Sequence, residues 1–493
     1  MIALAATAIT TPSVQLGPIL PTVVLTVGAL VLLLVASFER GGARVTSGVI
    51  GLVSFAGAGL ATWHLWDNGN GTAFSGQLAT DRYAALVQAI VCACGVASVL
   101  LGWGTRRLTD RIAEYYALLC FAGAGMCILA ASNGFVTLFV ALELFSISLY
   151  VLCALDVTNE ASLESGLKYL ITGSVGSAAL LFGSGLVYIA TKSLRFDDIG
   201  KALNAGAAHT GILLFGIALV VAGLAFKASA APFHMWTPDV YEGAPTAVMA
   251  FMATATKTIA LATLLRVMIT AFSPASDVWE SAVAAVAIAS MLIGNIAALR
   301  QTNVKRMLAY SSVGQAGYLL IAVVAHTPLA TRAMLYYLAV YTAMNLGALA
   351  VVSVREREIG GPVFLSDLRG LGRDHPLLAG GLALSLLSLA SFPPTGGFLA
   401  KLYLFASAID AGKTYLAVFG VIGTMISLGY YLRFLLAIYT QPAGGARPRI
   451  VPGTRLAAAT VLVSAAVVIW LGIAPQPLVD VARTAAASLV PPG

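Results

Sequence analysis

Two stretches of the chain decide its fold. The first, GLAFKASAAPFHMWTPDVYEGAP, covers residues 223–245, and the second, LASFPPTGGFLAKLYLF, covers residues 389–405. Each lies in a long apolar run that is interrupted by proline, at Pro232 in the first and at Pro393 and Pro394 in the second. Proline lacks a backbone N–H and its ring clashes with the preceding turn, so each apolar helix is predicted to break there.

The composition around these stretches indicates a membrane protein. Of the 493 residues, 59% are hydrophobic and only 10% are charged, with a mean hydropathy of +0.91. Soluble domains contain about 25% charged residues, so this chain lacks the charge to cover a water-facing surface. A membrane span needs roughly 20 mostly apolar residues, and we predict an all-α polytopic membrane protein of about 14 transmembrane helices. The spans are expected near residues 17–38, 44–66, 81–103, 112–131, 134–156, 162–191, 211–231, 244–271, 277–299, 303–325, 329–354, 376–410, 413–440 and 454–474.

The segments between the spans leave no room for a soluble domain. The longest connections are residues 192–210 and 355–375, and the tail at residues 476–490 is expected to form a short interfacial helix. The N-terminus lacks the basic region of a cleaved signal peptide, so we expect the first span to be retained. The predicted divisions are an N-terminal three-helix segment at 1–111, five-helix repeats at 112–271 and 272–440, and a C-terminal helix and tail at 441–493.

The two interrupted spans are the seventh and the twelfth in the chain. A separation of five spans predicts two five-helix repeats, spans 4–8 and spans 9–13, with broken helices 7 and 12. Because each unit has an odd number of spans, tandem copies must have inverted topology. Backbone groups freed by a break at membrane depth must face protein or water rather than lipid. Inverted repeats with broken helices are typical of transporters, in which the break marks the ion path.

Basic residues in the connections predict the orientation of the chain. If the N-terminus lies outside, the inside segments carry fifteen lysines and arginines and the outside segments carry seven. Such residues gather on the cytoplasmic side of membrane proteins, so we expect both termini on the outer face. The same connections account for the net charge of +7, which therefore does not indicate a nucleic-acid partner.

Four ionisable residues lie well inside the predicted spans. They are Glu143 in span five, Lys227 before the break of span seven, Lys257 in span eight and Lys401 after the break of span twelve. A charge at the bilayer centre costs about 2.5–3.5 kcal/mol on insertion scales, so such residues usually mark ion paths or proton relays. A structural ion pair or a lysine that snorkels to the interface is the alternative. We interpret the four as a relay, because two of them flank the broken helices.

Two further residues are weaker candidates. Lys168 lies near the start of span six, four residues after Glu164 on the same helical face, where a structural ion pair is a strong alternative. His234 follows the break of span seven and titrates near neutrality when unperturbed, so a relay role and a structural role both stay open. Polar residues of spans ten and eleven could bind relay water, although we favour a role in holding helices together. They are Tyr310, Ser311, Ser312, Gln315, Tyr318, Tyr341, Thr342 and Asn345.

The chemistry of lysine suits the transfer of protons. Burial in apolar surroundings lowers the pKa of a lysine, and a nearby carboxylate raises it again. A carboxylate that moves away would therefore release the proton of the lysine, so a Glu–Lys pair that opens and closes is a proton switch. Arginine could not take this role, because it does not deprotonate in proteins.

The sequence gives no support to several other chemistries. The five cysteines, all in apolar runs, match no zinc or iron–sulfur spacing. No phosphate-binding loop of the form G-x-x-x-x-G-K-[ST] occurs, so we do not expect ATP-driven pumping by this chain. We predict no cofactor and no metal site.

Four motifs carry a resemblance to a known family. They are ESGLKYLITGS at 164–174, PFHMWTPDVYEGAPTAVMAFMATATKTIA at 232–260, NVKRMLAYSSVGQAGY at 303–318 and FPPTGGFLAKLYLF at 392–405. Together they resemble the antiporter-like membrane subunits of respiratory complex I, over most of the chain and with the same 14-span plan.

The resemblance implies roles for individual residues. Glu143 resembles the span-five glutamate that pairs with the lysine of span seven, here Lys227. Lys257 resembles the central relay lysine of span eight, and Lys401 resembles the proton-exchange lysine of span twelve. Lys168 matches a family lysine of span six whose role is less defined. Two features distinguish the chain among the paralogues of this family. They are PDVYEGAP followed by Lys257, and Lys401 in span twelve, where one paralogue should carry a glutamate. Another paralogue should carry a long lateral helix at its C-terminus, for which this chain is expected to be too short.

The resemblance also implies a function. In this family, quinone reduction in a separate arm drives proton pumping through the membrane subunits. The chain would be a proton-translocating, non-redox subunit of NADH–quinone oxidoreductase in the bacterial inner membrane. Its partners would be other membrane-arm subunits, with no direct binding of NADH or quinone. Three alternatives remain, namely a subunit of a multi-subunit cation/proton antiporter, a structural scaffold and a self-contained solute transporter.

Overall fold

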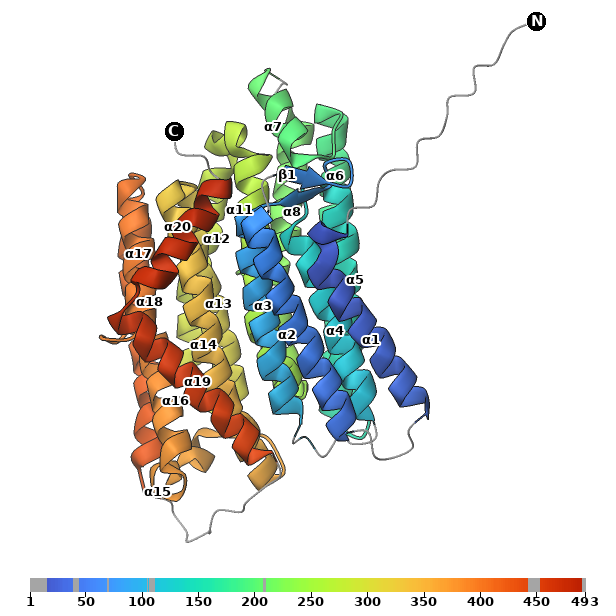
Figure 1. The fold of residues 1–493 in the computed structure, drawn as a ribbon. Helices are drawn as coiled ribbons and strands as arrows, with labels where there is room; N and C mark the ends of the chain where they lie inside the picture. Colours follow the sequence, from blue (N-terminus) through green and yellow to red (C-terminus); the bar gives the residue numbers. More distant parts are fainter. Residues whose placement is uncertain are drawn as a thin grey trace, which may run out of the picture.

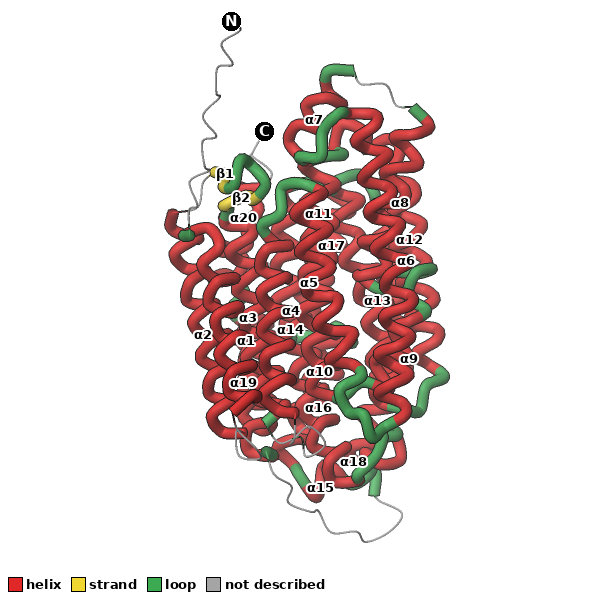
Figure 2. The backbone as a smooth tube through the Cα atoms, turned by 90° about the vertical axis from the view of Figure 1, so that its right-hand side faces the viewer, coloured by secondary structure: helices red, strands yellow, loops and turns green. Residues whose placement is uncertain are grey.

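The computed structural model describes residues 16–38, 44–68, 71–103, 105, 111–206, 210–441 and 453–489. Among these residues the regular elements are helices and one short hairpin, β1 (Gly71–Ala73) and β2 (Leu78–Thr80), so the all-α class is confirmed. Most of the long helices run along one common direction, whereas the helix Thr454–Ile473 crosses them obliquely (Figure 1). The hairpin and helix α7 lie at one end of the bundle and helix α15 lies at the other, as both views show (Figures 1 and 2).

The N-terminal and C-terminal segments pack on the sides of the bundle. A single 3-10 turn, Gly17–Ile19, precedes the N-terminal helices α1 (Leu20–Phe38), α2 (Arg44–Asn68) and α3 (Arg82–Gly102). The C-terminal helices are α19 (Thr454–Ile473) and α20 (Gln476–Leu489). Both C-terminal helices contact the long helix α14, and α20 also contacts α3. The predicted helix in the tail is thus confirmed as α20.

The first predicted repeat begins with three continuous helices, α4 (Ile112–Ala130), α5 (Phe135–Cys153) and α6 (Glu160–Thr191). Its broken span is α8 (Gly211–Ala228) followed by the short α9 (Trp236–Gly243). The last span is α10 (Thr246–Phe251), a π-helical turn (Met252–Thr256) and α11 (Lys257–Thr270). The short α7 (Phe196–Asn204) lies in the connection that was predicted to be a loop.

The second predicted repeat has the same order of elements. After a 3-10 turn (Ser273–Ala275) come α12 (Ser276–Leu299), α13 (Val304–Ala325) and α14 (Pro328–Ile359). The broken span is α16 (Pro376–Leu389) with α17 (Gly396–Asp410), and α18 (Thr414–Tyr439) closes the unit. The other predicted loop contains a 3-10 turn (Leu365–Leu368) and α15 (Leu371–Asp374).

The number of spans agrees with the prediction. Thirteen helices of the described residues are long and apolar enough to cross a membrane. The remaining span is the broken pair α16 and α17, whose halves are each too short to cross alone. The chain is therefore a multi-pass membrane protein.

The orientation prediction rests partly on residues that the structure does not describe. Of the basic residues counted for the inside segments, five lie outside the described residues, namely Arg40, Arg106, Arg107, Arg447 and Arg449.

Both broken spans end their first half in the same way. Ser229 and Ser391 adopt the left-handed conformation, with φ of 56° and 62°. The residue after each serine donates its N–H to the carbonyl five positions earlier, Ala230 to Ala225 and Phe392 to Leu387. These bonds make a Schellman ending, which is usually built on glycine. The two proline breaks are thus copies of one backbone structure.

A second shared feature supports inverted repeats. In each unit the start of the second helix forms an isolated antiparallel bridge with the segment after the third helix, Gly134 with Arg195 and Asn303 with Phe364. Each backbone bond of the first bridge recurs 169 positions later, as Phe135→Leu194 and Phe196→Asn133 recur in Val304→Val363 and Leu365→Thr302. The third helices, α6 and α14, both have 32 residues. The first bridge lies beside α7 and the second beside α15, at opposite ends of the molecule (Figure 1).

A buried ion pair joins the first repeat to the N-terminal segment. Arg266 in α11 donates two hydrogen bonds to Asp81, at 2.7 and 2.8 Å, and its side chain is 2% exposed. Asp81 also caps α3 by accepting the N–H of Ala84. Paired, bidentate geometry is what makes a buried arginine tolerable. The sequence reasoning had singled out neither Arg266 nor Asp81.

Candidate functional site

Lys227 is the first lysine of the predicted relay. It lies in the last turn of α8, one residue before the helix ends, and is 1% exposed. Its Nζ donates to Ser146 Oγ at 2.8 Å and to the Tyr150 hydroxyl at 3.4 Å, both on α5. Aromatic rings surround the ammonium at 5.3 to 5.9 Å, including those of Phe145 and Tyr169. The lysine is thus held by neutral groups rather than by a carboxylate.

Glu143 lies on α5 close to that contact. It precedes Ser146 by three residues, so the two side chains lie about one helical turn apart on the same face. Among the described residues, Glu143 forms no ion pair with Lys227, and its buried Oε1 has no hydrogen-bond partner. The Glu143–Lys227 pair implied by the family resemblance is therefore open in this structure.

Lys257 contacts the residue that follows Lys227, at the break in span seven. It follows the π-helical turn at Met252–Thr256 and is 2% exposed. Its Nζ donates to the Ala228 carbonyl at 2.6 Å. Ala228 is the last residue of α8 and the neighbour of Lys227, so the ending of the helix frees this carbonyl for a side chain. Single π turns inside α-helices frequently occur at functional sites.

Lys401 belongs to a different environment. It lies in α17, five residues after the helix start at Gly396, and is 2% exposed. Its Nζ lies 4.1 Å from the centre of the Tyr318 ring and 3.3 Å from Thr424 Oγ1. No ion pair to Lys401 occurs within the described residues. The second repeat therefore holds its lysine by a ring face and a hydroxyl.

A polar network continues from Lys401 across the second repeat. Asn295 on α12 donates to the Tyr318 hydroxyl at 3.0 Å and accepts from the Tyr430 hydroxyl at 2.9 Å. The ring of Tyr430 packs on that of Tyr431, with centres 4.3 Å apart. Ser311 and Gln315 form hydrogen bonds with the Tyr431 hydroxyl, and the Tyr337 hydroxyl donates to Gln315. The network joins α12, α13, α14 and α18, so it both ties helices together and offers groups that can exchange protons.

Lys168 lies in an ion-pair cluster, apart from the buried lysines. Its Nζ is 2.6 Å from Glu164 and 3.0 Å from Asp239, and its side chain is 43% exposed. Arg306 at the start of α13 joins the cluster through Asp239 at 2.8 Å and Glu242 at 2.9 Å. This geometry favours the structural alternative for Lys168.

His234 lies in the turn between α8 and α9. Its ring is partly buried and packs edge-on toward Tyr310, with ring centres 6.5 Å apart. Its Nδ1 is buried and has no hydrogen-bond partner among the described residues. His234 therefore remains a candidate relay residue because it lies next to the break, although no described residue forms a hydrogen bond with its Nδ1.

Lys305 is a buried charge that the sequence reasoning took for a connection residue. It lies in the first turn of α13, is 2% exposed, and donates to the Ala244 carbonyl at 2.7 Å. Its Nζ is 3.6 Å from Glu356 in α14. Because it stands at the end of an apolar span, its sequence position is typical of a topology signal. The sign available in the sequence was that this lysine lies inside the first turn of a predicted span.

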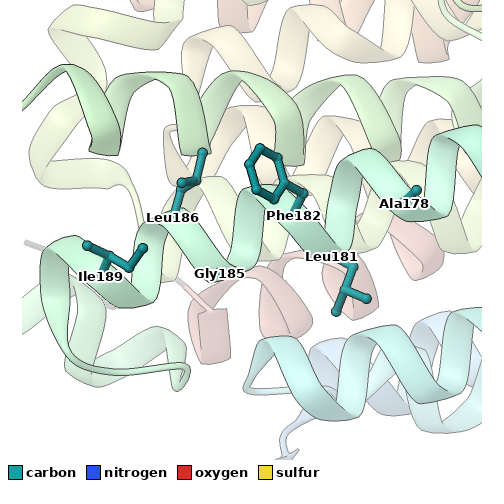
Figure 3. A pocket seen from close by; sticks show the side chains of 6 residues that line it. All are labelled: Ala178, Leu181, Phe182, Gly185, Leu186 and Ile189. Atoms are coloured by element: carbon teal, nitrogen blue, oxygen red, sulfur yellow. The ribbon is translucent and has the colours of Figure 1, made fainter.

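Sites for other chemistries are not formed by the described residues. They contain no group of three or more His, Cys, Asp and Glu side chains that could hold a metal ion, and their five cysteines are free and buried. A shallow hollow on α6 is lined by the six apolar residues shown in Figure 3, Ala178, Leu181, Phe182, Gly185, Leu186 and Ile189. A hollow without polar groups suits an acyl chain or a neighbouring helix better than a polar solute.

Comparisons with known proteins agree with this geometry. A family profile described as NADH:quinone oxidoreductase/Mrp antiporter, TM matches residues 132–427. The chain is 42% identical to NADH-quinone oxidoreductase subunit N of Methylobacterium nodulans, over 96% of this chain and 98% of that one. It is 38% identical to the subunit of the same name from Parvibaculum lavamentivorans, with the same coverage of both chains.

Solved structures show the same fold. A chain of respiratory complex I from Thermus thermophilus with bound aureothin has a TM-score of 0.79 and 32% identity, covering 93% of this chain and 98% of that one. A chain of the Mrp complex from Dietzia sp. DQ12-45-1b has a TM-score of 0.83 at 23% identity, over 96% and 98% of the two chains, and shows a common fold alone. The match of length, sequence and fold places this chain in the NADH-quinone oxidoreductase subunit N family, among the subunits of complex I.

Proposed function

We propose that the chain is a proton-translocating membrane-arm subunit of NADH-quinone oxidoreductase, which couples quinone reduction elsewhere in the complex to proton movement through its own lysines. The observation that carries this proposal is the contact at the end of α8. Lys257 binds the carbonyl of Ala228, the residue after Lys227, so buried lysines from two different spans are anchored at one backbone break. A fold that needed only packing would avoid two buried charges at membrane depth.

The open Glu143–Lys227 pair gives the switch. Movement of the Lys227 ammonium from Ser146 toward Glu143, about one turn away on α5, would stabilise its protonated form. Movement back toward Ser146 and the aromatic rings would favour release of the proton. Lys257, fixed to the Ala228 carbonyl, would accept this proton when it is neutral. The proton is the transferred species, and no bond other than N–H forms or breaks.

Water would connect the buried groups. Several buried hydroxyls have no hydrogen-bond partner among the described residues, and buried polar groups are normally satisfied by protein or ordered water. They include those of Tyr169, Tyr241, Thr256 and Tyr341. These hydroxyls lie on α6, α9, α14 and the π turn next to Lys257. Hydration there would link the first repeat to Lys401 and its network, from which the proton would leave.

The energy for this movement must come from outside the chain. Outward transfer of one charge costs about 2.3 kcal/mol per 100 mV of membrane potential. In this proposal the chain holds no redox centre or metal and binds neither NADH nor quinone. It lies in the bacterial inner membrane with both termini on the outer face. The lipid-exposed apolar residues of α1 and α2, such as Leu34, Phe38 and Trp63, supply a surface for neighbouring membrane-arm subunits.

Replacement of Lys227 tests the proposal. Lys227→Ala is introduced in the native host, assembly is checked, and NADH-driven quinone reduction and proton pumping are measured in membrane vesicles. We expect pumping to fall at least about ten-fold, because a proton carrier is worth about 10² or more in rate. Lys201→Ala is the matched control, since Lys201 is 77% exposed on α7.

The alternatives predict other results. A scaffold would keep full pumping in an assembled Lys227→Ala complex. A cation/proton antiporter, the second candidate because the Mrp chain has this fold, would show sodium-dependent proton exchange and no dependence of pumping on NADH. A solute transporter would show uptake by the chain alone. Unchanged NADH oxidation and pumping in Lys227→Ala would remove the relay from this protein.

A further inference from the structure

The first repeat meets α13 and α14 at a buried ion pair near the α15 end of the bundle. Lys305 is 2% exposed, and its Nζ donates to the Ala244 carbonyl at 2.7 Å and lies 3.6 Å from Glu356 Oε1. The other carboxylate oxygen of Glu356 accepts a hydrogen bond from the Thr246 hydroxyl. The pair thus connects the start of α10 to α13 and α14, outside the relay proposed above.

The position of Lys305 is unfavourable for a permanent positive charge. It lies in the first turn of α13, where the helix macrodipole is positive and disfavours cations. Burial adds a desolvation cost, which the carbonyl and the carboxylate must offset. Arg306, the next residue, avoids this cost because its side chain is 31% exposed and paired with Asp239 and Glu242. A basic residue that only sets the orientation of a span should have its side chain exposed, as Arg306 does. The side chain of Lys305 is buried.

The two partners differ in their access to water. The side chain of Glu356 is 24% exposed, whereas that of Lys305 is 2% exposed. The carboxylate therefore lies nearer the surface of the bundle, and the ammonium lies behind it. Such an arrangement gives an order of contact, from water to Glu356 and from Glu356 to Lys305.

The internal repeat shows that the fold does not require this pair. Lys305 is the second residue of α13, and its counterpart, the second residue of α5, is Val136. Glu356 is the fourth residue from the end of α14, and its counterpart in the equally long α6 is Tyr188. Val136 and Tyr188 are exposed on the surface of the first repeat, while the bridge beside them forms normally. The same helix arrangement is built there without an ion pair.

The pair also stands at the foot of a span that leads to the relay. Thr246, the partner of Glu356, begins α10, and Lys257 lies eleven residues later in the same span. At 1.5 Å per residue this distance is about 16 Å along the helix. Residues 246–268 of this span are all buried. Thr256, one residue before Lys257, has a buried hydroxyl without a hydrogen-bond partner among the described residues.

We propose that Glu356 and Lys305 form a proton-loading pair, through which protons from the aqueous phase at the α15 end reach the relay lysines. This inference rests on the proposed pumping function and adds two residues to it. Lys305 gives its proton inward and becomes a neutral amine. The Glu356 carboxylate then takes a proton from water and passes it to Lys305, which restores the ion pair. One proton enters and one moves on, so charge and atoms balance in each cycle.

Two substitutions test the loading role against a structural role. Glu356→Gln keeps the size of the side chain and can still accept the Thr246 hydrogen bond, but it cannot carry a proton. Lys305→Arg keeps the charge and a donor for Ala244, but arginine does not deprotonate in proteins. Both are measured in the intact complex, with assembly checked, as the ratio of protons pumped to NADH oxidised. Lys413→Gln is the matched control, since Lys413 pairs with Glu280 near the opposite end.

We expect a loss of pumping of at least about ten-fold in both variants, with the control unchanged, because each removes one proton-carrying group. Full pumping in assembled Glu356→Gln overturns the inference, and full pumping in Lys305→Arg overturns it equally, since a fixed charge would then be sufficient. If Lys305→Arg does not assemble, Glu356→Gln decides alone. Lys227→Ala is measured beside them. If it abolishes pumping while Glu356→Gln does not, the proposed function stands and the loading pair is wrong.

Discussion

The two repeats make the same contact with different chemistry. In the first repeat, Ser146 on the second helix receives the ammonium of Lys227, two residues before the left-handed Ser229. In the second, the equivalent of Ser146 is Gln315, and its Nε2 lies 3.4 Å from the carbonyl of Leu389, two residues before the left-handed Ser391. The backbone of the repeat is kept, and the side chain before the break has changed from lysine to leucine.

The charges have moved to new places on this shared frame. The position of Glu143 is taken in the second repeat by Ser312, which bonds its own helix at the Ala309 carbonyl. Lys401 follows Ser391 by ten residues, and the residue ten after Ser229 is Asp239, in the ion-pair cluster. In the proposed relay, the first repeat would therefore switch a lysine against a carboxylate. The second repeat holds a lysine among hydroxyls and rings, which suits continuous exchange with a polar network.

The largest effect is expected at Lys257, which binds the broken end of α8. Lys257→Ala removes the carrier that the proposed relay places between Lys227 and the second repeat, and it leaves the Ala228 carbonyl without its donor. We expect pumping to fall about a hundred-fold in an assembled complex, because positioned proton carriers contribute about 10² to 10⁴ in rate. The measurement is NADH-driven acidification of inverted membrane vesicles. Lys257→Arg keeps a donor to the carbonyl, so normal pumping in that variant would mean that the contact matters and the exchange does not.

The second prediction tests whether the lysine of the second repeat exchanges its proton. Lys401→Arg keeps a cation over the Tyr318 ring and a donor for Thr424, and it cannot deprotonate. We expect normal assembly with a loss of pumping of about ten-fold or more. Undiminished pumping in this variant would show that the second repeat works through a fixed charge, and the contrast between the repeats would then be wrong.

Much of the fold is predictable because lipid restricts the choices of the chain. Each span must be long and apolar, and prolines at membrane depth mark the breaks at Pro232 and Pro393. The repeat follows from the spacing of those breaks. The hairpin β1–β2, the π turn before Lys257 and the short helices α7 and α15 carry no comparable sequence signal, since they depend on contacts that form only after the bundle has packed.

The site is less predictable, because the sequence marks a charge but not its partner. Glu143, Lys227, Lys257 and Lys401 stand out as charges in apolar runs, and the structure buries the three lysines. The pairing of Arg266 with Asp81 spans 185 residues, and no local pattern reports it. Burial of Lys305 was missed for a similar reason, since a lysine at a span end is ordinary until α9, α10 and α14 cover it.

A smaller effect is expected from the paired contacts of the two repeats. Ser146→Ala removes the 2.8 Å hydrogen bond to Lys227, and a hydrogen bond to a charged group contributes about 1.5–3 kcal/mol. We expect pumping to fall several-fold, up to about ten-fold, with assembly intact. Gln315→Ala breaks bonds to Tyr337 and Tyr431 without touching a lysine, so it should lower the thermal stability of the complex more than its pumping. Equal losses of pumping in the two variants would mean that the Ser146 and Gln315 contacts serve proton transfer to the same extent, which would contradict the contrast between the repeats.

The smallest effect is expected at Lys168, which has no charged counterpart in the second repeat. Its position in α6 corresponds to Tyr336 in α14, whose hydroxyl donates to the Leu471 carbonyl. Lys168→Ala leaves Asp239 paired with Arg306 at 2.8 Å, so the cluster keeps a cation. Half-exposed ion pairs contribute about 1 kcal/mol or less, and we expect pumping to change by less than about two-fold. Acidification of inverted vesicles is measured for Lys168→Ala and Lys257→Ala in parallel, so that the two losses of pumping can be compared. A loss as large as that of Lys257→Ala would place Lys168 in the relay. The lysine–carboxylate switch of the first repeat would then include the half-exposed contacts of Lys168 with Glu164 and Asp239.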